Sequence, residues 1–246
     1  MLLHGFRSAS HQYARLIEEL KDDFHVVAPD HPGSGHTVVP GERHHTFDLL
    51  ADTVEKFLQA LNSTGFTMYV FDFGAPVGFR VATRHPEWVK GLVVQNGNAY
   101  EDGLSDVAKG FIGNSDPQAA RALLAPEHTR FGYLEGARDP ESISPDTWTL
   151  DQHHLDLRPQ PQVDLFLDYH TNVARYPQWQ AYFREHQPPT LIVWGQGDPF
   201  FLEPGARAYL RDLPGARLRL FDTGHFALEE ELTEIAALIR EFAAKR

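Results

Sequence analysis

The sequence predicts an α/β protein with a mostly parallel, doubly wound sheet and a helical cap. Short runs rich in β-branched residues alternate with longer helical patterns, and this alternation is typical of such a sheet. Most of these runs are continuously apolar, as expected where helices cover both faces of parallel strands. The chain has 246 residues, of which 42% are hydrophobic. That is enough for one α/β domain with an insertion or for two small domains.

Five short segments have the composition of strands. They read "FHVVAPD", "TMYVFD", "GLVVQN", "TLIVWG" and "ARLRLFD", at residues 24–30, 67–72, 91–96, 190–195 and 216–222. Two longer segments place apolar residues on one helical face. Residues 46–62 do so with Phe47, Leu50, Val54, Phe57, Leu58 and Leu61, and residues 229–245 with Leu232, Ile235, Leu238, Ile239 and Phe242.

Residues 99–188 break this rhythm and form the predicted cap. The segment is rich in Asp, Pro, Gln, Tyr and His and lacks a convincing buried strand. Residues 115–124 and 162–183 have helical patterns, and about ninety residues without structure are improbable in a compact domain. We therefore expect a core of residues 1–98 and 189–246, with a helical lid between its two parts.

The bulk composition excludes several classes of function. A net charge of −12 disfavours binding to nucleic acid or anionic lipid, and no apolar run approaches the length of a membrane span. The absence of Cys excludes disulfides, thiol catalysis and thiolate metal sites. The glycine-rich motifs lack a complete dinucleotide loop, and the adjacent His pairs lack metal-ligand spacing. We expect a cytoplasmic protein without metal or cofactor that acts on a small-molecule substrate.

Asp72 stands where a predicted strand turns into a helix. Gly74 and Ala75 follow directly, and small neighbours allow the sharp turn that lifts one side chain clear of the sheet. The sequence Val70-Phe71-Asp72-Phe73-Gly74 therefore predicts a nucleophile elbow with a carboxylate at the nucleophile position. Such a carboxylate attacks an electrophilic carbon and forms an ester. The alternative is an Asp that caps the following helix.

His225 and Asp198 complete the predicted catalytic set. Hydrolysis of an aspartyl ester needs a base to activate water, and His225 lies between the last strand and the last helix. Asp198 follows the strand at 190–195 and would hold the imidazole in the required tautomer. The alternative for Asp198 is a turn residue in Gly-Asp-Pro. The order Asp72, Asp198, His225 is nucleophile, acid, base.

Five segments resemble the α/β-hydrolase superfamily, and most closely its Asp-nucleophile branch of haloalkane dehalogenases and epoxide hydrolases. They are "LLHGF", "HVVAPDHPGSG", "FDFGAPVGFRVATRHPEWV", "LIVWGQGDPFF" and "DTGHFALEE". The resemblance covers nearly the whole chain and is least specific in the lid. It implies an eight-stranded sheet, a helical cap, no cofactor and a triad of Asp72, Asp198 and His225. It also implies an oxyanion hole made by the backbone N–H groups of Phe6 and Phe73.

Departures from the family patterns bear on the leaving group. Haloalkane dehalogenases usually have Trp after the nucleophile, where this chain has Phe73. A dehalogenase would need another halide donor, and the candidates are Trp148, Asn96 and Asn98. Fluoroacetate dehalogenases have Arg at the Phe73 position.

Epoxide hydrolases place two lid tyrosines over the epoxide oxygen. Tyr169 lies near the expected place, with Tyr133 or Tyr176 as the second. This chain differs from the His-Gly-x-Pro motif of that family, because Arg7 stands at the position of the Pro. Epoxide ring opening is therefore slightly favoured over dehalogenation, and lid tyrosines that serve only packing remain the alternative.

The resemblance would make "MLLHGF" the third strand of its fold. We therefore expect a sheet without its first two strands, in which residues 24–30 form an exposed apolar edge. Such an edge predicts marginal stability or a homodimer. A non-catalytic, truncated family member is the rival from another class, and an ordinary esterase is disfavoured because neither Ser nor Cys occupies the elbow.

Overall fold

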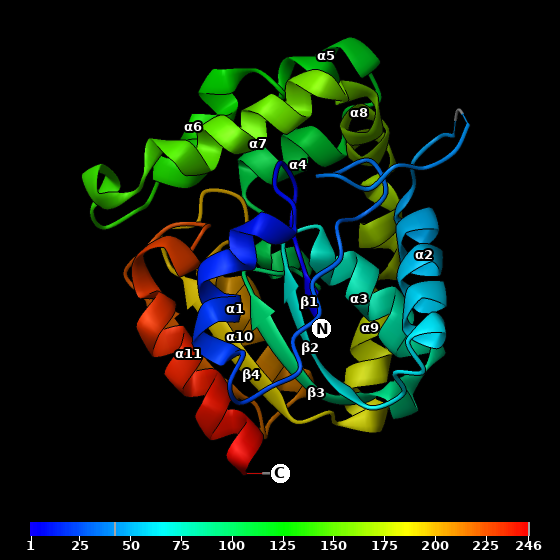
Figure 1. The fold of residues 1–246 in the computed structure, drawn as a ribbon, viewed down its shortest axis with the longest axis vertical. Coiled ribbons are helices and arrows are strands. Elements are labelled where there is room, and N and C mark those ends of the chain that lie inside the picture. Colours follow the sequence, from blue (N-terminus) through cyan, green and yellow to red (C-terminus); the bar gives the residue numbers. More distant parts are fainter. Residues whose placement is uncertain (42, 246) are drawn as a thin grey trace.

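The sheet of this protein contains five parallel strands in the order β1-β2-β3-β4-β5, in a computed structural model that describes residues 1–41 and 43–245. The strands are β1 (Leu2–Leu3), β2 (Phe66–Phe71), β3 (Val89–Gln95), β4 (Thr190–Gly195) and β5 (Arg217–Phe221). Since all pairs are parallel, the carboxyl ends of the strands meet at one edge of the sheet (Figure 1).

Helices connect these strands and fill the long insertion. They are α1 (Ala14–Leu20), α2 (Phe47–Ala60), α3 (Gly74–Arg84), α4 (Asp106–Ile112), α5 (Pro117–Ala122), α6 (Pro126–Leu134), α7 (Pro145–Leu157), α8 (Pro159–Asp168), α9 (His170–His186), α10 (Glu203–Asp212) and α11 (Leu228–Ala244). Short 3₁₀ turns are η1 (Ser10–Tyr13), η2 (Pro86–Trp88), η3 (Glu101–Gly103) and η4 (Pro140–Ser142).

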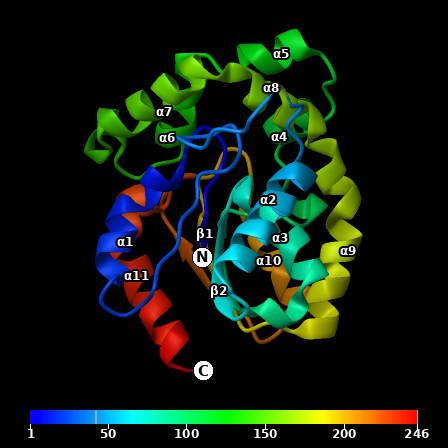
Figure 2. The same ribbon diagram turned by 45° about the vertical axis from the view of Figure 1, so that its right-hand side comes forward.

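Alternate residues of each strand point into two different cores. Met68 and Val70 of β2 pack with α2, α3, α9 and α10, whereas Tyr69 and Phe71 pack with α1 and α11. Figure 2 shows these two groups of helices on opposite sides of the sheet. The continuous apolar runs in the sequence are explained by this arrangement, because both faces of each inner strand are buried.

Four of the five predicted strands are confirmed within two residues at each end, and the helices predicted at residues 46–62 and 229–245 are confirmed as α2 and α11. Thr46 begins α2 by accepting a hydrogen bond from the Leu49 N–H at 3.1 Å. The prediction of a strand at residues 24–30 is wrong. The Leu2 N–H donates to the Val27 carbonyl at 2.8 Å, but β1 offers only two residues for pairing and Pro29 has no N–H.

The implied eight-stranded sheet is also not found, since the described residues form five strands. None of the helices in the described part of the chain combines the length and the apolar character that crossing a membrane requires.

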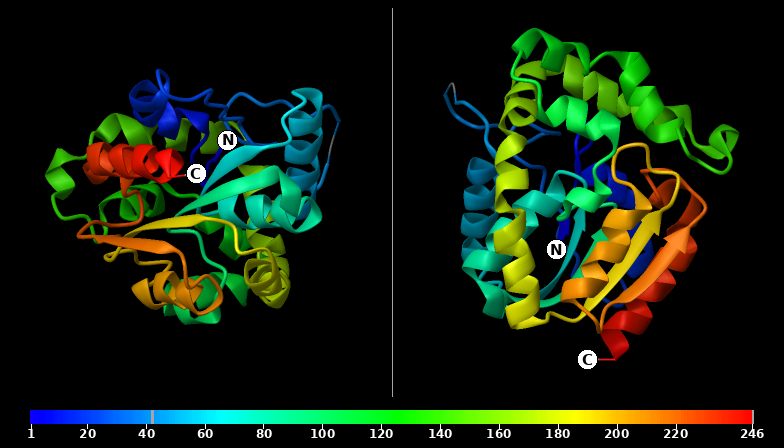
Figure 3. Two further views of the ribbon diagram at one scale, coloured as in Figure 1. Left: turned by 90° about the horizontal axis from the view of Figure 1, so that it is seen from below. Right: turned by 180° about the vertical axis from the view of Figure 1, so that it is seen from behind.

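Residues 99–188 form the helices α4 to α9, and α4 to α8 lie beyond the carboxyl edge of the sheet (Figure 1). The last helix of the segment, α9, is not part of the lid. It runs back along the core and packs against α3 (Figure 3). Two carboxylates of α8 join it to the start of α2. Asp164 accepts from the His45 N–H at 3.0 Å and Asp168 accepts from the Phe47 N–H at 2.8 Å.

Candidate active site

Asp72 occupies a strained turn between β2 and α3. Its φ of 47° lies in the left-handed region, which residues other than Gly seldom adopt. Gly74 makes the turn sterically possible, because a Cβ at that position would lie 2.1 Å from the Leu3 carbonyl oxygen. The local sequence therefore forms the sharp strand-to-helix elbow that was predicted, and Asp72 stands at its tip.

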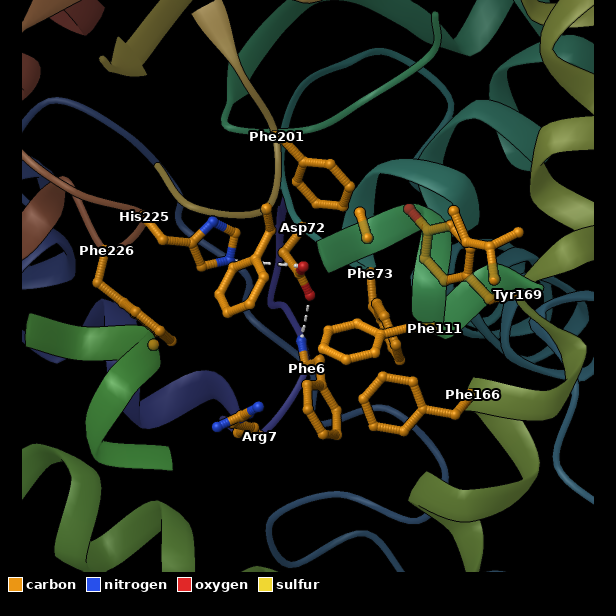
Figure 4. Close-up of a pocket in the computed structure, with 14 residues that line it drawn as sticks. Phe6, Arg7, Asp72, Phe73, Phe111, Phe166, Tyr169, Phe201, His225 and Phe226 are labelled. Atoms are coloured by element: carbon orange, nitrogen blue, oxygen red, sulfur yellow. Dashed lines mark hydrogen bonds and ion pairs between the residues drawn. The ribbon is translucent and has the colours of Figure 1, made fainter. Parts of the chain in front are cut away.

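Both carboxylate oxygens of Asp72 are held by neighbouring groups (Figure 4). The Phe6 N–H donates to Oδ1 at 2.6 Å, and His225 Nε2 lies 3.5 Å from Oδ2. The side chain is buried apart from the face it presents to a pocket. One oxygen is thus fixed by the backbone, and the other faces the imidazole.

Asp198 orients His225 from the opposite side. Its Oδ2 lies 2.7 Å from His225 Nδ1, and both side chains are buried. Asn96 donates to the same oxygen at 2.7 Å, while the Phe200 and Phe201 N–H groups donate to Oδ1 at 2.7 and 3.1 Å. These donors fix the position of the carboxylate, so Asp198 can accept a hydrogen bond from Nδ1 and direct Nε2 towards Asp72.

The charge of Asp72 contributes to the protonation state of His225. Burial lowers the pKa of the imidazole, but the carboxylates of Asp198 and Asp72 outweigh burial and raise the pKa to about 9. At neutral pH the resting pair is therefore an imidazolium beside a carboxylate. If Asp72 became an ester its charge would disappear, and the pKa of His225 would fall towards the range of a general base.

A small apolar pocket opens in front of Asp72 (Figure 4). Its free volume is about 50 Å³. The lining residues come from the core loops and from the inserted helices, and most are aromatic or aliphatic: Phe6, Arg7, Asp72, Phe73, Ala108, Phe111, Ile112, Gly132, Phe166, Tyr169, Phe200, Phe201, His225 and Phe226. Such a pocket suits a small ligand whose body is largely apolar.

Tyr169 lines this pocket at the junction of α8 and α9. Its hydroxyl shares a hydrogen bond with the hydroxyl of Tyr176, which also accepts from Asn98 Nδ2 at 3.1 Å. Burial, with a further contribution from Tyr176, raises the pKa of Tyr169 well above its usual value. The phenol therefore keeps its proton at neutral pH.

The structure does not bring every predicted residue to the pocket. Asn96 contacts Asp198 instead of the pocket, and its Oδ1 accepts from the Gly195 N–H at 3.0 Å. Tyr133 donates to Asp151 at 2.6 Å and stacks on Phe226. Trp148 packs against Tyr133, so neither of these two side chains is among those that line the pocket.

Sequence reasoning missed the position of two polar groups. Arg7 lines the pocket, although the sequence marked it only as a departure from a motif. The side chain of Asn96 supports Asp198, and its φ of 40° places it in a second left-handed turn, directly after β3. In the described residues no group of three or more His, Cys, Asp or Glu side chains is arranged to hold a metal ion.

The fold and this site together define a hydrolase. A buried carboxylate on an elbow, a carboxylate–imidazole pair and a backbone amide meet at the carboxyl edge of a parallel sheet. The family model of the alpha/beta hydrolase fold matches residues 1–232. The chain therefore belongs to the α/β-hydrolase fold family.

Relatives and solved structures agree with this assignment. An uncharacterized hydrolase of Saccharomyces cerevisiae is 38% identical over 248 residues, covering 96% of this chain and 86% of that protein. A haloalkane dehalogenase of Mycobacterium marinum is 26% identical and covers 97% and 82%. The solved structure of a thermophilic esterase from Thermogutta terrifontis has a TM-score of 0.80 at 22% identity, and covers 99% of this chain and 88% of its own.

Proposed function

We propose that this protein hydrolyses a small epoxide through a covalent aspartyl ester, in the manner of the Asp-nucleophile branch of its family. The observation that carries the proposal is the placement of the Asp72 carboxylate, on the elbow between the Phe6 N–H and His225, at the floor of an apolar pocket. A carboxylate at this position calls for an electrophilic carbon as its target, because it forms an alkyl ester.

In the first step Oδ2 of Asp72 attacks a ring carbon of the epoxide. The new C–O bond forms as the ring C–O bond breaks, and the electron pair of that bond goes to the ring oxygen. Tyr169 donates its proton to this oxygen, which leaves a hydroxyalkyl ester of Asp72. The proton on His225 then returns to the Tyr169 phenolate, so that His225 becomes neutral.

In the second step water attacks the ester at the carboxyl carbon of Asp72. Neutral His225 removes a proton from the water, and the Phe6 N–H, already 2.6 Å from Oδ1, stabilises the negative charge on that oxygen. The ester bond breaks and the alkoxide leaves as an alcohol with the proton of the attacking hydroxyl. One epoxide and one water have become a diol, with Asp72 ionised and His225 protonated again.

A panel of small epoxides, haloalkanes and carboxylic esters tests this assignment. We expect diol formation from at least one epoxide, abolished by Asp72→Ala. Asp72→Asn is a less suitable control, since slow deamidation could restore the carboxylate. Hydrolysis of esters alone, unaffected by Asp72→Ala, would contradict the proposal.

Dehalogenation is a second candidate, favoured by the 26% identity to a haloalkane dehalogenase. The same attack by Asp72 would expel a halide instead of opening a ring. The side chain of Phe73 offers no N–H, and Trp148 is not among the residues that line the pocket. Release of halide from the haloalkanes, without diol from the epoxides, would favour this candidate.

A further inference from the structure

Arg7 is a buried cation in the wall of the pocket. Arg7 is only 7% exposed, and it follows Phe6 with a φ of 72°. Burial lowers the pKa of its guanidinium to about 10, so the group stays charged at neutral pH. The guanidinium lies over the Phe6 ring, 4.9 Å from the ring centroid (Figure 4).

This cation has no ion-pair partner among the described residues, and its buried Nη1 makes no hydrogen bond. The carboxylates of Asp72 and Asp151 act on the charge of Arg7, but both make their close polar contacts with other residues. Asp72 is held by Phe6 and His225, and Asp151 accepts from His11 at 2.8 Å and from Tyr133 at 2.6 Å. A buried charge with unused donors is unfavourable unless a partner arrives.

A glycine lies beside Nη1. Gly132 of α6 also lines the pocket, and a Cβ there would lie 3.8 Å from Nη1 without a clash. The missing side chain leaves room for a small group beside the unused N–H. The other lining residues are mostly aromatic or aliphatic, and the one carboxylate among them, Asp72, is held by the Phe6 N–H and His225.

We propose that Arg7 binds a carboxylate of the substrate, so that the preferred substrates are small 2,3-epoxy acids. This inference rests on the proposed function for the reaction, but its binding part can be tested separately. A guanidinium recognises a planar carboxylate through charge-assisted hydrogen bonds, and such recognition is strong where water is excluded. The carboxylate stays unchanged while Asp72 opens the ring, and it offsets the charge of Arg7.

Two substrates of nearly equal size provide the first experiment. Glycidate and glycidamide differ in charge at the group that would face Arg7. We expect kcat/KM of the wild type to favour glycidate by about tenfold or more, the usual worth of a hydrogen bond to a charged group. Equal rates, or a preference for the amide, would overturn the inference.

Substitution of the arginine provides the second experiment. Arg7→Gln should bring the acid-to-amide ratio close to one, and Arg7→Lys should retain part of the preference. Arg130→Gln is the matched control, because Arg130 is exposed on the same helix as Gly132 and its replacement removes the same charge. A preference that survives Arg7→Gln, or that Arg130→Gln removes equally, would count against a carboxylate site at Arg7.

Binding of an unreactive pair separates this inference from the reaction. Cyclopropanecarboxylate and cyclopropanecarboxamide have the shape of the two substrates but no reactive ring oxygen. Calorimetry of the wild type should show tighter binding of the acid, even if no epoxide is hydrolysed. That result would support the carboxylate site while the proposed reaction fails. Amide binding as tight as acid binding, or bromide that competes as strongly as the acid, would overturn it.

Discussion

Asp72 combines backbone strain with a fixed carboxylate. A non-glycine residue at φ 47° costs on the order of 1 kcal/mol or more, and such strain persists where the surrounding structure enforces it. The Phe6 N–H and His225 then hold the two oxygens in different roles. The strain is thus compensated by neighbours that also hold the carboxylate in place.

In the proposed mechanism, Tyr169 is the general acid for ring opening, and its replacement tests that step alone. Tyr169→Phe should lower kcat for epoxides by about 10²-fold or more, the usual worth of a positioned general acid. Tyr182→Phe is the matched control, since the Tyr182 hydroxyl is buried in α9 without a hydrogen bond and does not line the pocket. An epoxide rate that is unchanged by Tyr169→Phe would remove this residue from the mechanism.

At the scale of elements, the elbow depends on how closely α3 approaches β1. Gly74 touches the backbone of Leu3, and a Cβ on Gly5 would lie 2.6 Å from the Cβ of Asp72. The short β1 therefore does more than extend the sheet, because it fixes the turn of Asp72 and carries the chain into the loop of Phe6.

Replacement of Gly74 tests this packing. Gly74→Ala places a methyl group 2.1 Å from the Leu3 oxygen, and we expect the free energy of unfolding to fall by about 1–3 kcal/mol or more, as in overpacked cores. Urea denaturation measures the change. Gly110→Ala is the control, because nothing lies within 4 Å of a Cβ there and α4 should gain stability. Equal stability of Gly74→Ala and the wild type would show that the elbow can move.

For the whole molecule, much of the sheet was predictable because buried parallel strands read as continuous apolar runs. The positions of Asp72, Asp198 and His225 after three predicted strands also follow from the sequence. The roles of Arg7 and Asn96 do not, since both depend on contacts between segments that lie far apart in the chain. Residues 24–30 have the composition of a strand, but the neighbouring strand β1 is too short to pair with them. Composition alone cannot reveal the length of the neighbouring strand.

The edge of the sheet beside β1 is a candidate contact surface between two copies of the protein. Phe24 and Val26 line a groove there, and Leu61 beside them is 48% exposed. We expect a homodimer through this edge, because exposed apolar edges with unpaired backbone groups favour pairing with another chain. Light scattering should give twice the mass of the 27.8 kDa chain.

Matched variants locate the contact. Val26→Glu should yield monomers, while Val38→Glu should remain dimeric because Val38 is 78% exposed and does not line the groove. A monomeric wild type with cooperative unfolding would show that the edge is stable uncovered.

The proposed covalent intermediate on Asp72 is the most direct target for measurement. His225→Gln protein, incubated with an epoxide that the wild type hydrolyses, should accumulate the hydroxyalkyl ester, because attack proceeds while activation of water is lost. Mass spectrometry should then find the peptide containing Asp72 heavier by the mass of one substrate molecule. The variant that also carries Asp72→Ala should show no such increase. An unmodified Asp72 peptide in His225→Gln, or an adduct on another residue, would contradict the ester mechanism.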